Sequence, residues 1–326
     1  MATYTSTQIV NAGESRTFNP GDIFSGITNH AIVNNGTVTT NGILITANTC
    51  SAYGAGIYTW ASLSSQENAT AAIISNSTFS DNYSTQSGAA VYINDNWGTL
   101  DVKGSTFSNN IAETCSGAIE FHGVSCSISG SLFDGNQGKK EKTQAGAVTI
   151  GTGGTAETGR FLWEYLDISN SIFVNNQGAN GGGLYIGVAK EHTSETGSPY
   201  IATVSGSTFS GNVAQSSGGA IDANENLHVE ECLFHGNTSA KSGNGGAINS
   251  SAGGTQLLEI TNSTFTCNVV TSNENHTVGY GGAVNVAAAT FSVTGSLFHD
   301  NSALSDGGAI FTFQNDDAVT IINSTS

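Results

Sequence analysis

Two short signals lie together in the stretch Phe298-His299-Asp300-Asn301-Ser302-Ala303-Leu304-Ser305-Asp306-Gly307-Gly308-Ala309-Ile310. The first is F-x-x-N, and the second is three small residues followed by an aliphatic residue. F-x-x-N recurs at Phe79/Asn82, Phe107/Asn110, Phe133/Asn136, Phe173/Asn176, Phe209/Asn212, Phe234/Asn237, Phe265/Asn268 and Phe298/Asn301. The second signal ends at Ile57, Val91, Ile119, Val148, Leu184, Ile221, Ile248, Val284 and Ile310. Because the two signals alternate without a break, the chain is an array of one repeating unit.

The spacing of the repeat locates its insertions. Successive motif phenylalanines lie 25 to 40 residues apart. The segment from each Phe to the next aliphatic residue varies little, whereas the segment from the aliphatic residue to the next Phe ranges from 13 to 25 residues. We therefore expect one edge of the repeat array to carry the loops.

The apolar residues alternate with period two, which indicates strands and not helices. Examples are the pairs Val91/Ile93, Ile119/Phe121 and Val284/Val286. A second apolar position precedes each Phe and is followed by Gly or Asn, which favours a bend. Each unit thus has about three short strands and three bends, and the sequence predicts an all-β parallel β-helix of nine to ten turns.

The residue two positions after each motif Phe is a turn residue. It is Asp81, Asn109, Gly135, Asn175, Gly211, Gly236 or Asp300, all of types that tolerate a positive φ, whereas Cys267 does not fit. We expect the following Asn residues to stack as an amide ladder that satisfies buried backbone groups, and the Phe side chains to fill the interior as a column.

Two regions are predicted along the chain. Residues 1–48 read as an N-terminal cap and the first β-helix turns, and residues 49–326 as the repeat β-helix with an open or truncated C-terminal end. Asn48-Thr49-Cys50 resembles the segment before Phe79, with Cys50 in the Phe position. Cys232 takes a position held elsewhere by Ser77 and Ser207, so we expect it to point inward.

Composition and charge exclude several classes of function. A net charge of −17 argues against binding to nucleic acid or to anionic membranes. No run of about 18 apolar residues is present, so no membrane-spanning helix is expected. Residues 1–20 show no signal peptide.

The alternation of F-x-x-N with G-G-A-[ILV] from about Tyr53 to Phe313 resembles the passenger domains of chlamydial polymorphic membrane proteins. The resemblance implies a right-handed β-helix displayed on the bacterial cell surface, attached to the outer membrane in the full-length protein. It further implies an adhesin that binds host surfaces and sometimes self-associates.

The loop edge is the first candidate binding surface. Two long insertions, 151–166 and 187–202, lie on adjacent turns, and aromatic and Arg side chains are favoured interface anchors. The candidate partner-binding residues are Trp60, Trp97, Arg160, Phe161, Trp163, Tyr165 and Tyr200. The alternative is that these aromatics fold back and cover an edge of the solenoid.

A second candidate surface is an aromatic face. Tyr58, Tyr92 and Tyr185 each follow a motif aliphatic residue and should face outward. Outward Tyr side chains bind sugar or protein, and the alternative is simple stacking on a sheet surface.

The sequence contains few residues arranged as catalysis or metal binding requires. Glu230-Glu231 and Asp316-Asp317 are the only adjacent carboxylate pairs of one type, and neither has the partners that a polysaccharide-cleaving β-helix needs. His235 and His299 share one repeat position but lie two turns apart, roughly 10 Å by strand spacing, too far to share an ion. No catalytic residue, metal or cofactor is expected.

The sequence is thus interpreted as a non-catalytic, extracellular adhesin that binds a host cell-surface protein or glycan. The first alternative is a fibre or scaffold subunit that associates with its own copies by end-to-end stacking. The second is a polysaccharide-degrading β-helix enzyme.

Overall fold

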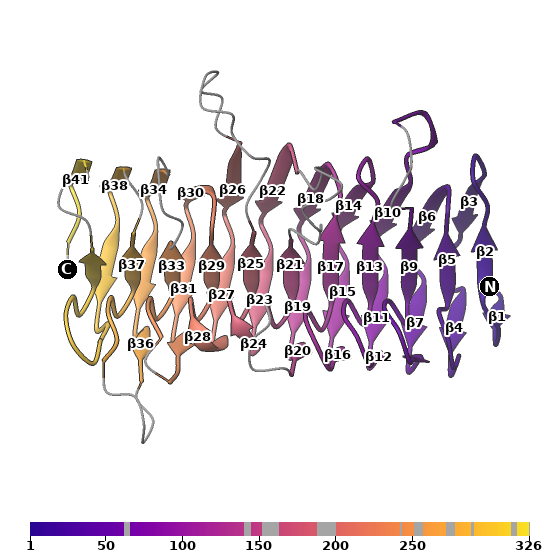
Figure 1. Cartoon of the computed structure of the whole chain (residues 1–326), viewed down its shortest axis with the longest axis horizontal. Helices are drawn as coiled ribbons and strands as arrows, with labels where there is room; N and C mark the ends of the chain where they lie inside the picture. Colours follow the sequence, from indigo (N-terminus) through magenta and orange to yellow (C-terminus); the bar gives the residue numbers. More distant parts are fainter. Residues whose placement is uncertain are drawn as a thin grey trace, which may run out of the picture.

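The chain forms an elongated solenoid of short parallel strands, seen here in a computed structural model (Figure 1). The structure describes residues 1–61, 66–139, 145–151, 163–187, 200–241, 243–250, 257–271, 278–287, 290–313 and 318–325. The N-terminus lies at one end of the solenoid and the C-terminus at the other. One short 3-10 helix, η1 (Gln66–Asn68), interrupts the strands.

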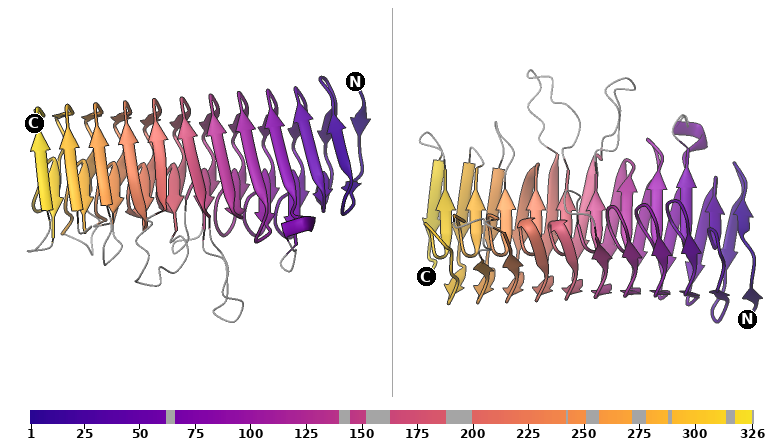
Figure 2. Two further views of the ribbon diagram at one scale, coloured as in Figure 1. Left: turned by 90° about the horizontal axis from the view of Figure 1, so that it is seen from above. Right: turned by 60° about the horizontal axis from the view of Figure 1, so that its bottom comes forward.

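Four parallel sheets run the length of the solenoid, because each strand pairs with the equivalent strand one turn away (Figure 2). The Phe sheet contains β1 (Thr3–Tyr4), β4 (Ile23–Ser25), β7 (Leu44–Thr46), β11 (Thr78–Ser80), β15 (Thr106–Ser108), β19 (Leu132–Asp134), β23 (Ile172–Val174), β27 (Thr208–Ser210), β31 (Leu233–His235), β35 (Thr264–Thr266) and β39 (Leu297–His299). The short sheet contains β8 (Thr49–Cys50), β12 (Tyr83–Ser84), β16 (Ile111–Ala112), β20 (Gln137–Gly138), β24 (Gln177–Asn180), β28 (Val213–Ser217), β32 (Thr238–Ser239) and β36 (Val269–Val270).

The other two sheets carry the remaining apolar positions. The GGA sheet, whose strands begin at or next to the motif aliphatic residue, contains β2 (Gln8–Val10), β5 (Ile32–Asn34), β9 (Ile57–Trp60), β13 (Val91–Asn94), β17 (Ile119–His122), β21 (Val148–Ile150), β25 (Leu184–Ile186), β29 (Ile221–Ala223), β33 (Ile248–Ser250), β37 (Val284–Val286) and β40 (Ile310–Thr312). The long-strand sheet contains β3 (Ser15–Phe18), β6 (Thr37–Asn41), β10 (Ala71–Ser75), β14 (Thr99–Lys103), β18 (Ser125–Ser129), β22 (Tyr165–Ser169), β26 (Ile201–Ser205), β30 (Asn226–Glu230), β34 (Leu257–Thr261), β38 (Thr290–Thr294) and β41 (Ala318–Ile322).

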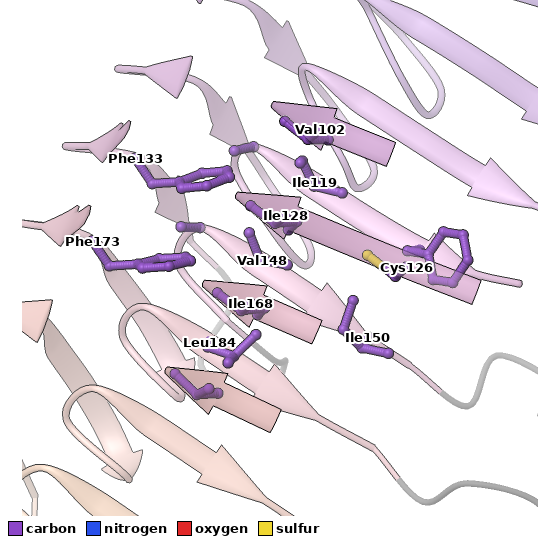
Figure 3. Packing of buried hydrophobic residues seen from close by; sticks show 14 of the residues in the cluster. Val102, Ile119, Cys126, Ile128, Phe133, Val148, Ile150, Ile168, Phe173 and Leu184 are labelled. Carbon is purple, nitrogen blue, oxygen red and sulfur yellow. The ribbon is translucent and has the colours of Figure 1, made fainter. Parts of the chain in front are cut away.

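The core is a set of identical side-chain columns. Ring centroids of successive motif phenylalanines, from Phe79 to Phe298, are 4.6–5.1 Å apart with interplanar angles of 4–10°. Figure 3 shows Phe133 and Phe173 pointing between Ile128 and Ile168 of the long-strand sheet and the aliphatic residues of the GGA sheet. The expected Phe column is therefore confirmed, and each turn packs chiefly on its two neighbours.

The predicted Asn ladder is also confirmed, and it uses the full capacity of each amide. Asn176 Oδ1 accepts hydrogen bonds from Asn136 N and Asn136 Nδ2, both at 3.0 Å. Asn176 Nδ2 donates to Asn212 Oδ1 at 2.9 Å and to the carbonyl of Phe133 at 3.0 Å. Asn136 and Asn176 are fully buried, so the ladder satisfies backbone groups that no water reaches.

The same ladder continues into the C-terminal turns. Asn237 Nδ2 donates to Asn268 Oδ1 and to the carbonyl of Phe209, both at 2.9 Å. Asn268 Nδ2 donates to Asn301 Oδ1 at 2.9 Å and to the carbonyl of Phe234 at 3.0 Å. Asn237 and Asn268 are 0% exposed, so these two motif residues hold the turns together and offer no surface to a partner.

Positive φ angles occur where the turn chemistry predicts them. Asp81, Asn109 and Asn175 have φ of 52–56°. Cys267, which does not suit the position, adopts φ 56° as well, and Glu231 adopts φ 53° at the bend before the Phe sheet. The repeat geometry thus imposes this conformation even on residues that disfavour it.

The structure corrects the sequence interpretation of three features. A fourth strand, in the short sheet, directly follows the Asn in every turn from Asn48 to Asn268, and after Asn301 an isolated bridge between Ser302 and Val269 takes its place. The other three sheets hold eleven strands each, more than the nine to ten turns expected, because residues 1–48 supply strands of the same sheets. Cys50 does not take the Phe position: it pairs with Ser84, while Ile45 pairs with Phe79 and Asn48 bonds to Asn82 Oδ1 at 3.1 Å. Ile45-x-x-Asn48 is thus the motif copy that the search for Phe missed.

The second glycine of the small-residue run is needed for close approach of successive turns. A Cβ on Gly219 would overlap the carbonyl oxygen of Gly246 on the next turn and the backbone of Thr238. The first glycine, Gly218, has φ 61°. These two requirements explain the Gly-Gly pair. Cys232 is buried in the serine column, as expected, and its amide donates to Ser263 Oγ at 3.1 Å.

Replacing one Asn of the ladder should destabilise the solenoid locally. Asn176→Ala leaves the amide of Asn136 and the carbonyl of Phe133 buried without these partners, and each lost partner costs about 1–3 kcal/mol. We expect the free energy of unfolding, measured in urea melts, to fall by at least about 3 kcal/mol. Hydrogen exchange of the backbone amides should be faster in the turns between residues 136 and 212.

The adjacent exposed residue gives the control for this ladder variant. Asn175→Gly keeps a positive φ at a solvent-facing position and should leave stability within about 0.5 kcal/mol. Equal stability of Asn176→Ala and Asn175→Gly would show that the ladder is dispensable.

Candidate functional site

The outer face of the GGA sheet differs from the outer faces of the Phe sheet and the long-strand sheet. Strands of the Phe sheet and the long-strand sheet alternate between buried and accessible residues, as in β14 and β15. Every residue of β13, β17, β29, β33 and β37 is buried. In Figure 1 these strands run between the long-strand sheet and the short sheet. The side chains that point away from the core therefore lie in a recessed face, where binding groups are held rigidly.

An aromatic cluster occupies the N-terminal part of this recessed face. Tyr92 is 4% exposed yet lies outside the hydrophobic core, between Tyr53 at 4.4 Å and Tyr58 at 6.0 Å by ring centroids. Trp60 lies 6.3 Å from Tyr92 and is 45% exposed. His30 stacks on Tyr58 at 4.2 Å. Burial, and next the charge of Glu120, raise the pKa of the Tyr92 hydroxyl, so it stays a neutral hydrogen-bonding group.

A buried ion pair follows on the next turn. His122 Nε2 lies 2.7 Å from Glu120 Oε1, and the other ring nitrogen, Nδ1, lies 3.1 Å from the carbonyl oxygen of Gly151. Burial alone would lower the pKa of His122, but Glu120 and this carbonyl outweigh it and raise the pKa. Glu120 Oε2 is buried and has no hydrogen-bond partner among the described residues.

A row of polar side chains continues the recessed face toward the C-terminus. Asn285 Nδ2 donates to Asn249 Oδ1 at 2.8 Å, and Asn249 Nδ2 donates to Asp222 Oδ1 at 2.7 Å. These three residues are 3–6% exposed. Burial raises the pKa of the Asp222 carboxyl to about 6, although the bond from Asn249 lowers it.

This polar row forms the floor of a groove with a volume of about 500 Å³. The groove spans five turns, because Tyr185, Asp222, Asn249, Asn285 and Phe311 pair in register on successive strands. Its sides are formed by residues that flank the GGA strands, namely Asn180, Ser217, Asn224, Asn244, Tyr280, Ala287 and Phe313. A groove of this volume accommodates a small ligand.

The structure separates the residues of the predicted loop edge. Tyr165 is 53% exposed at the start of β22, and Trp97 is half-buried, with its amide donating to Asp95 Oδ1 at 3.1 Å. Trp163 is only 2% exposed and its Nε1 donates to the carbonyl of Gly187, while Tyr200 packs against the core. Trp163 therefore folds back onto the solenoid, as the alternative expectation had it, and offers no exposed ring. Arg160 and Phe161 lie outside the described residues.

The three tyrosines of the predicted aromatic face point away from the core but are less exposed than expected. Tyr58 and Tyr185 are half-buried, and Tyr92 is buried. Tyr58 and Tyr92 belong to the aromatic cluster, whereas Tyr185 accepts a hydrogen bond from Asn224 Nδ2 at 2.9 Å at one end of the groove. The recess of this face explains why the three tyrosines are less exposed than expected. The alternation of residues along a strand predicts which face a side chain lies on, but not how deeply that face is recessed.

The described residues were also considered as metal ligands and as membrane-spanning segments. No group of three or more His, Cys, Asp or Glu side chains suited to a metal ion is found within the described ranges. His235 and His299 pair with Thr266 from opposite sides and so lie two turns apart, as expected. None of the described segments is a helix long and apolar enough to cross a membrane.

The polar row of the groove was not predicted from the sequence. Asp222, Asn249 and Asn285 occupy the same repeat position as Tyr58 and Tyr92, directly after the motif aliphatic residue. Comparing that one position across all repeats, and not only its aromatic copies, would have found them. Tyr53 and Tyr280 directly precede the small-residue run, a position that is not part of either repeated motif.

The buried carboxylate of Asp222 should lower stability at neutral pH. Its folded pKa of about 6 exceeds the usual value of 3.8, so the folded chain holds the proton more tightly than the unfolded chain. Stability therefore falls as pH rises from about 4 to about 6, and the loss persists above pH 6. We expect Asp222→Asn to raise the free energy of unfolding at pH 7.5 by up to about 3 kcal/mol.

Urea melts at pH 4.5 and 7.5 measure this effect, with Asp101→Asn on the exposed face of β14 as the matched control. Asp101→Asn should change neither value appreciably. A variant Asp222→Asn that is less stable than the parent at pH 7.5 would contradict the assignment.

Comparison with known proteins finds one family model that matches three segments of the chain. The family model described as the Chlamydia polymorphic membrane protein repeat matches residues 206–224, 231–251 and 295–312. Each match runs from the bend before a Phe strand through the following GGA strand, which is the half of the repeat with the least variable length. Neither the curated proteins nor the solved structures yield a match. Three segments of this β-helix thus match the repeat of the Chlamydia polymorphic membrane proteins, which supports a passenger-like domain of that kind.

Proposed function

We propose that this β-helix is a non-catalytic adhesin, displayed at a bacterial cell surface, that binds molecules on host cells. The polymorphic membrane protein repeat and the solenoid support a surface passenger. The observation that carries the binding function is the aromatic cluster on the outer face of the GGA sheet. Packing of the solenoid core accounts for the interior Phe column, but not for these aromatic side chains, which lie on the outer face of the GGA sheet.

The aromatic cluster has the features of a protein-binding anchor. Trp60 is 45% exposed and rests against Tyr92, whose ring is held by Tyr53 and Tyr58. A large exposed ring on a rigid aromatic base loses little conformational entropy on binding, and Trp and Tyr dominate interface hot spots. Trp60 also belongs to the predicted loop edge, because β9 ends at this residue.

Tyr165 defines the competing surface on the loop edge. It is 53% exposed at the start of β22, away from the GGA sheet. The two positions allow a direct comparison, because each is one accessible aromatic side chain at a strand end. Catalysis is not part of the proposal, since the described lining of the groove holds a single carboxylate, Asp222, whereas glycoside hydrolysis uses two.

Binding of the purified, fluorescently labelled chain to mammalian epithelial cells tests the proposal. We expect saturable binding that weakens at least about tenfold in Trp60→Ala, because loss of a hot-spot ring costs roughly 2 kcal/mol. Ile73→Ala, which removes a 38% exposed side chain from the long-strand sheet, is the control and should bind normally.

Three other outcomes are informative. Normal binding by Trp60→Ala with loss in Tyr165→Ala moves the site to the loop edge. Absence of saturable binding by the parent chain refutes the adhesin function. Concentration-dependent filaments without cell binding would favour the fibre subunit that assembles by end-to-end stacking.

A further inference from the structure

The groove over Asp222, Asn249 and Asn285 is chemically distinct from the aromatic cluster and suggests a second binding site. Its lining residues lie between Asn180 and Phe313, whereas the aromatic cluster lies between His30 and Tyr92. Between them stand the buried Glu120–His122 pair and Thr149, so the two regions do not merge.

The polar row has unused hydrogen-bonding capacity. Asp222 accepts one bond, from Asn249, and its second carboxylate oxygen has no partner among the described residues. Asn249 has one N–H beyond the bond that it donates, and Asn285 Oδ1 accepts no bond from the described chain. Donors and acceptors therefore alternate along the floor, although the three residues are more than nine-tenths buried. None of the three residues contributes to the buried side-chain atoms without a partner, so their unpaired polar atoms open onto the groove and can bond to a ligand.

Aromatic rings close both ends of this polar row. Tyr185 pairs with Asp222 at one end, and Asn285 pairs with Phe311 at the other. Tyr280 stacks on Phe311 with ring centroids 4.5 Å apart and an interplanar angle of 20°, which makes a flat apolar wall. From Tyr185 to Phe311 the groove spans four strand spacings, so its length is ~19 Å. That length and the volume of about 500 Å³ suit a short oligomer better than a single ring.

The charge of the groove narrows the class of ligand. Its described lining contains one carboxylate and neither Lys nor Arg, within a chain of net charge −17. An anionic ligand such as a sulfated or sialylated glycan therefore meets no cation and an unfavourable field. A cationic peptide would be attracted, but it would leave the amides of Asn244, Asn249 and Asn285 poorly used, because an ammonium group only donates hydrogen bonds.

We propose that this groove binds a neutral oligosaccharide, with hydroxyl groups bonded to Asp222, Asn249 and Asn285 and sugar faces packed on Tyr185 and on the Tyr280–Phe311 wall. Hydroxyl groups both donate and accept, so they match the alternating amides and carboxylate. Aromatic rings pack against the apolar C–H faces of sugars while their polar edges stay solvated. The proposal deepens the adhesin function and rests on it, by naming a ligand class for one part of the same face.

Calorimetric titration of the full chain with neutral tetrasaccharides tests the proposal. The probes are lacto-N-tetraose, chitotetraose and maltotetraose, with a heparin tetrasaccharide and tetralysine as charged comparators. We expect saturable binding of at least one neutral probe. Asp222→Asn and Tyr280→Ala should each weaken it at least about tenfold, since a hydrogen bond to a charged group and an aromatic contact each contribute that much. Asp101→Asn should bind as the parent does.

The two variants guard against loss of folding. Asp222→Asn is expected to be more stable than the parent at neutral pH, so loss of binding in it reports on the groove. Tyr280→Ala probes the opposite end of the row, and far-ultraviolet circular dichroism confirms the fold of both variants.

Several results would overturn the sugar site. These are an absence of binding to all neutral probes, a preference for heparin tetrasaccharide or tetralysine, or unchanged affinity in both variants. Cell binding that survives enzymatic removal of N- and O-glycans, together with no sugar binding, rejects the sugar site and leaves the adhesin function intact. Sugar binding without cell binding rejects the adhesin function alone.

Discussion

One hydrogen-bonding constraint governs the whole solenoid: a buried Asn must lie above the Asn of the previous turn. The amide of Asn176 makes all four of its hydrogen bonds to neighbouring turns, so a turn of different shape would leave several buried polar groups unpaired. This constraint fixes the register of the adjoining Phe strand and short strand. The phenylalanine column then stacks at van der Waals distance, and the length of chain between Asn and the next GGA strand varies little.

Variation is permitted where this constraint does not act. Insertions follow the GGA strands, and the residue directly after the motif aliphatic residue changes from Tyr92 to Glu120, Asp222 and Asn249 without disturbing the strand pairing. The core-facing motif residue directly before it stays aliphatic in all four strands, as Val91, Ile119, Ile221 and Ile248. A rigid interior thus presents a recessed outer face whose chemistry differs from turn to turn, which is a suitable basis for recognition by a passenger-like domain.

Much of the fold could be predicted from the sequence, because the Phe column, the Asn ladder and the positive-φ turns each follow from one residue type at a fixed spacing. The turn with Ile45 was misplaced, since an aliphatic residue replaces Phe there. The candidate site was harder to predict, because alternation places Tyr92 on the outer face but cannot show that this face is recessed. Trp163 lies in an insertion, yet it is buried with its indole N–H bonded to Gly187. The polar row of the groove depends on residues several turns apart, and only the stacking of turns brings them together.

The Asn ladder also has a direction. Each Asn donates its backbone N–H and one side-chain N–H to the Oδ1 of the Asn on the following turn, as Asn82 does to Asn110. The Nδ2 of that following Asn donates in return to the carbonyl of the Phe on the preceding turn, as Asn110 does to Phe79. A partly formed solenoid therefore ends, on its C-terminal side, in three unpaired groups: the backbone N–H and a side-chain N–H of the last Asn, and the carbonyl of the last Phe. The Asn of the next turn forms hydrogen bonds with all three. Assembly in the order of synthesis would add one turn at a time to a ready template, so that the folded part serves as the nucleus for the part still to come.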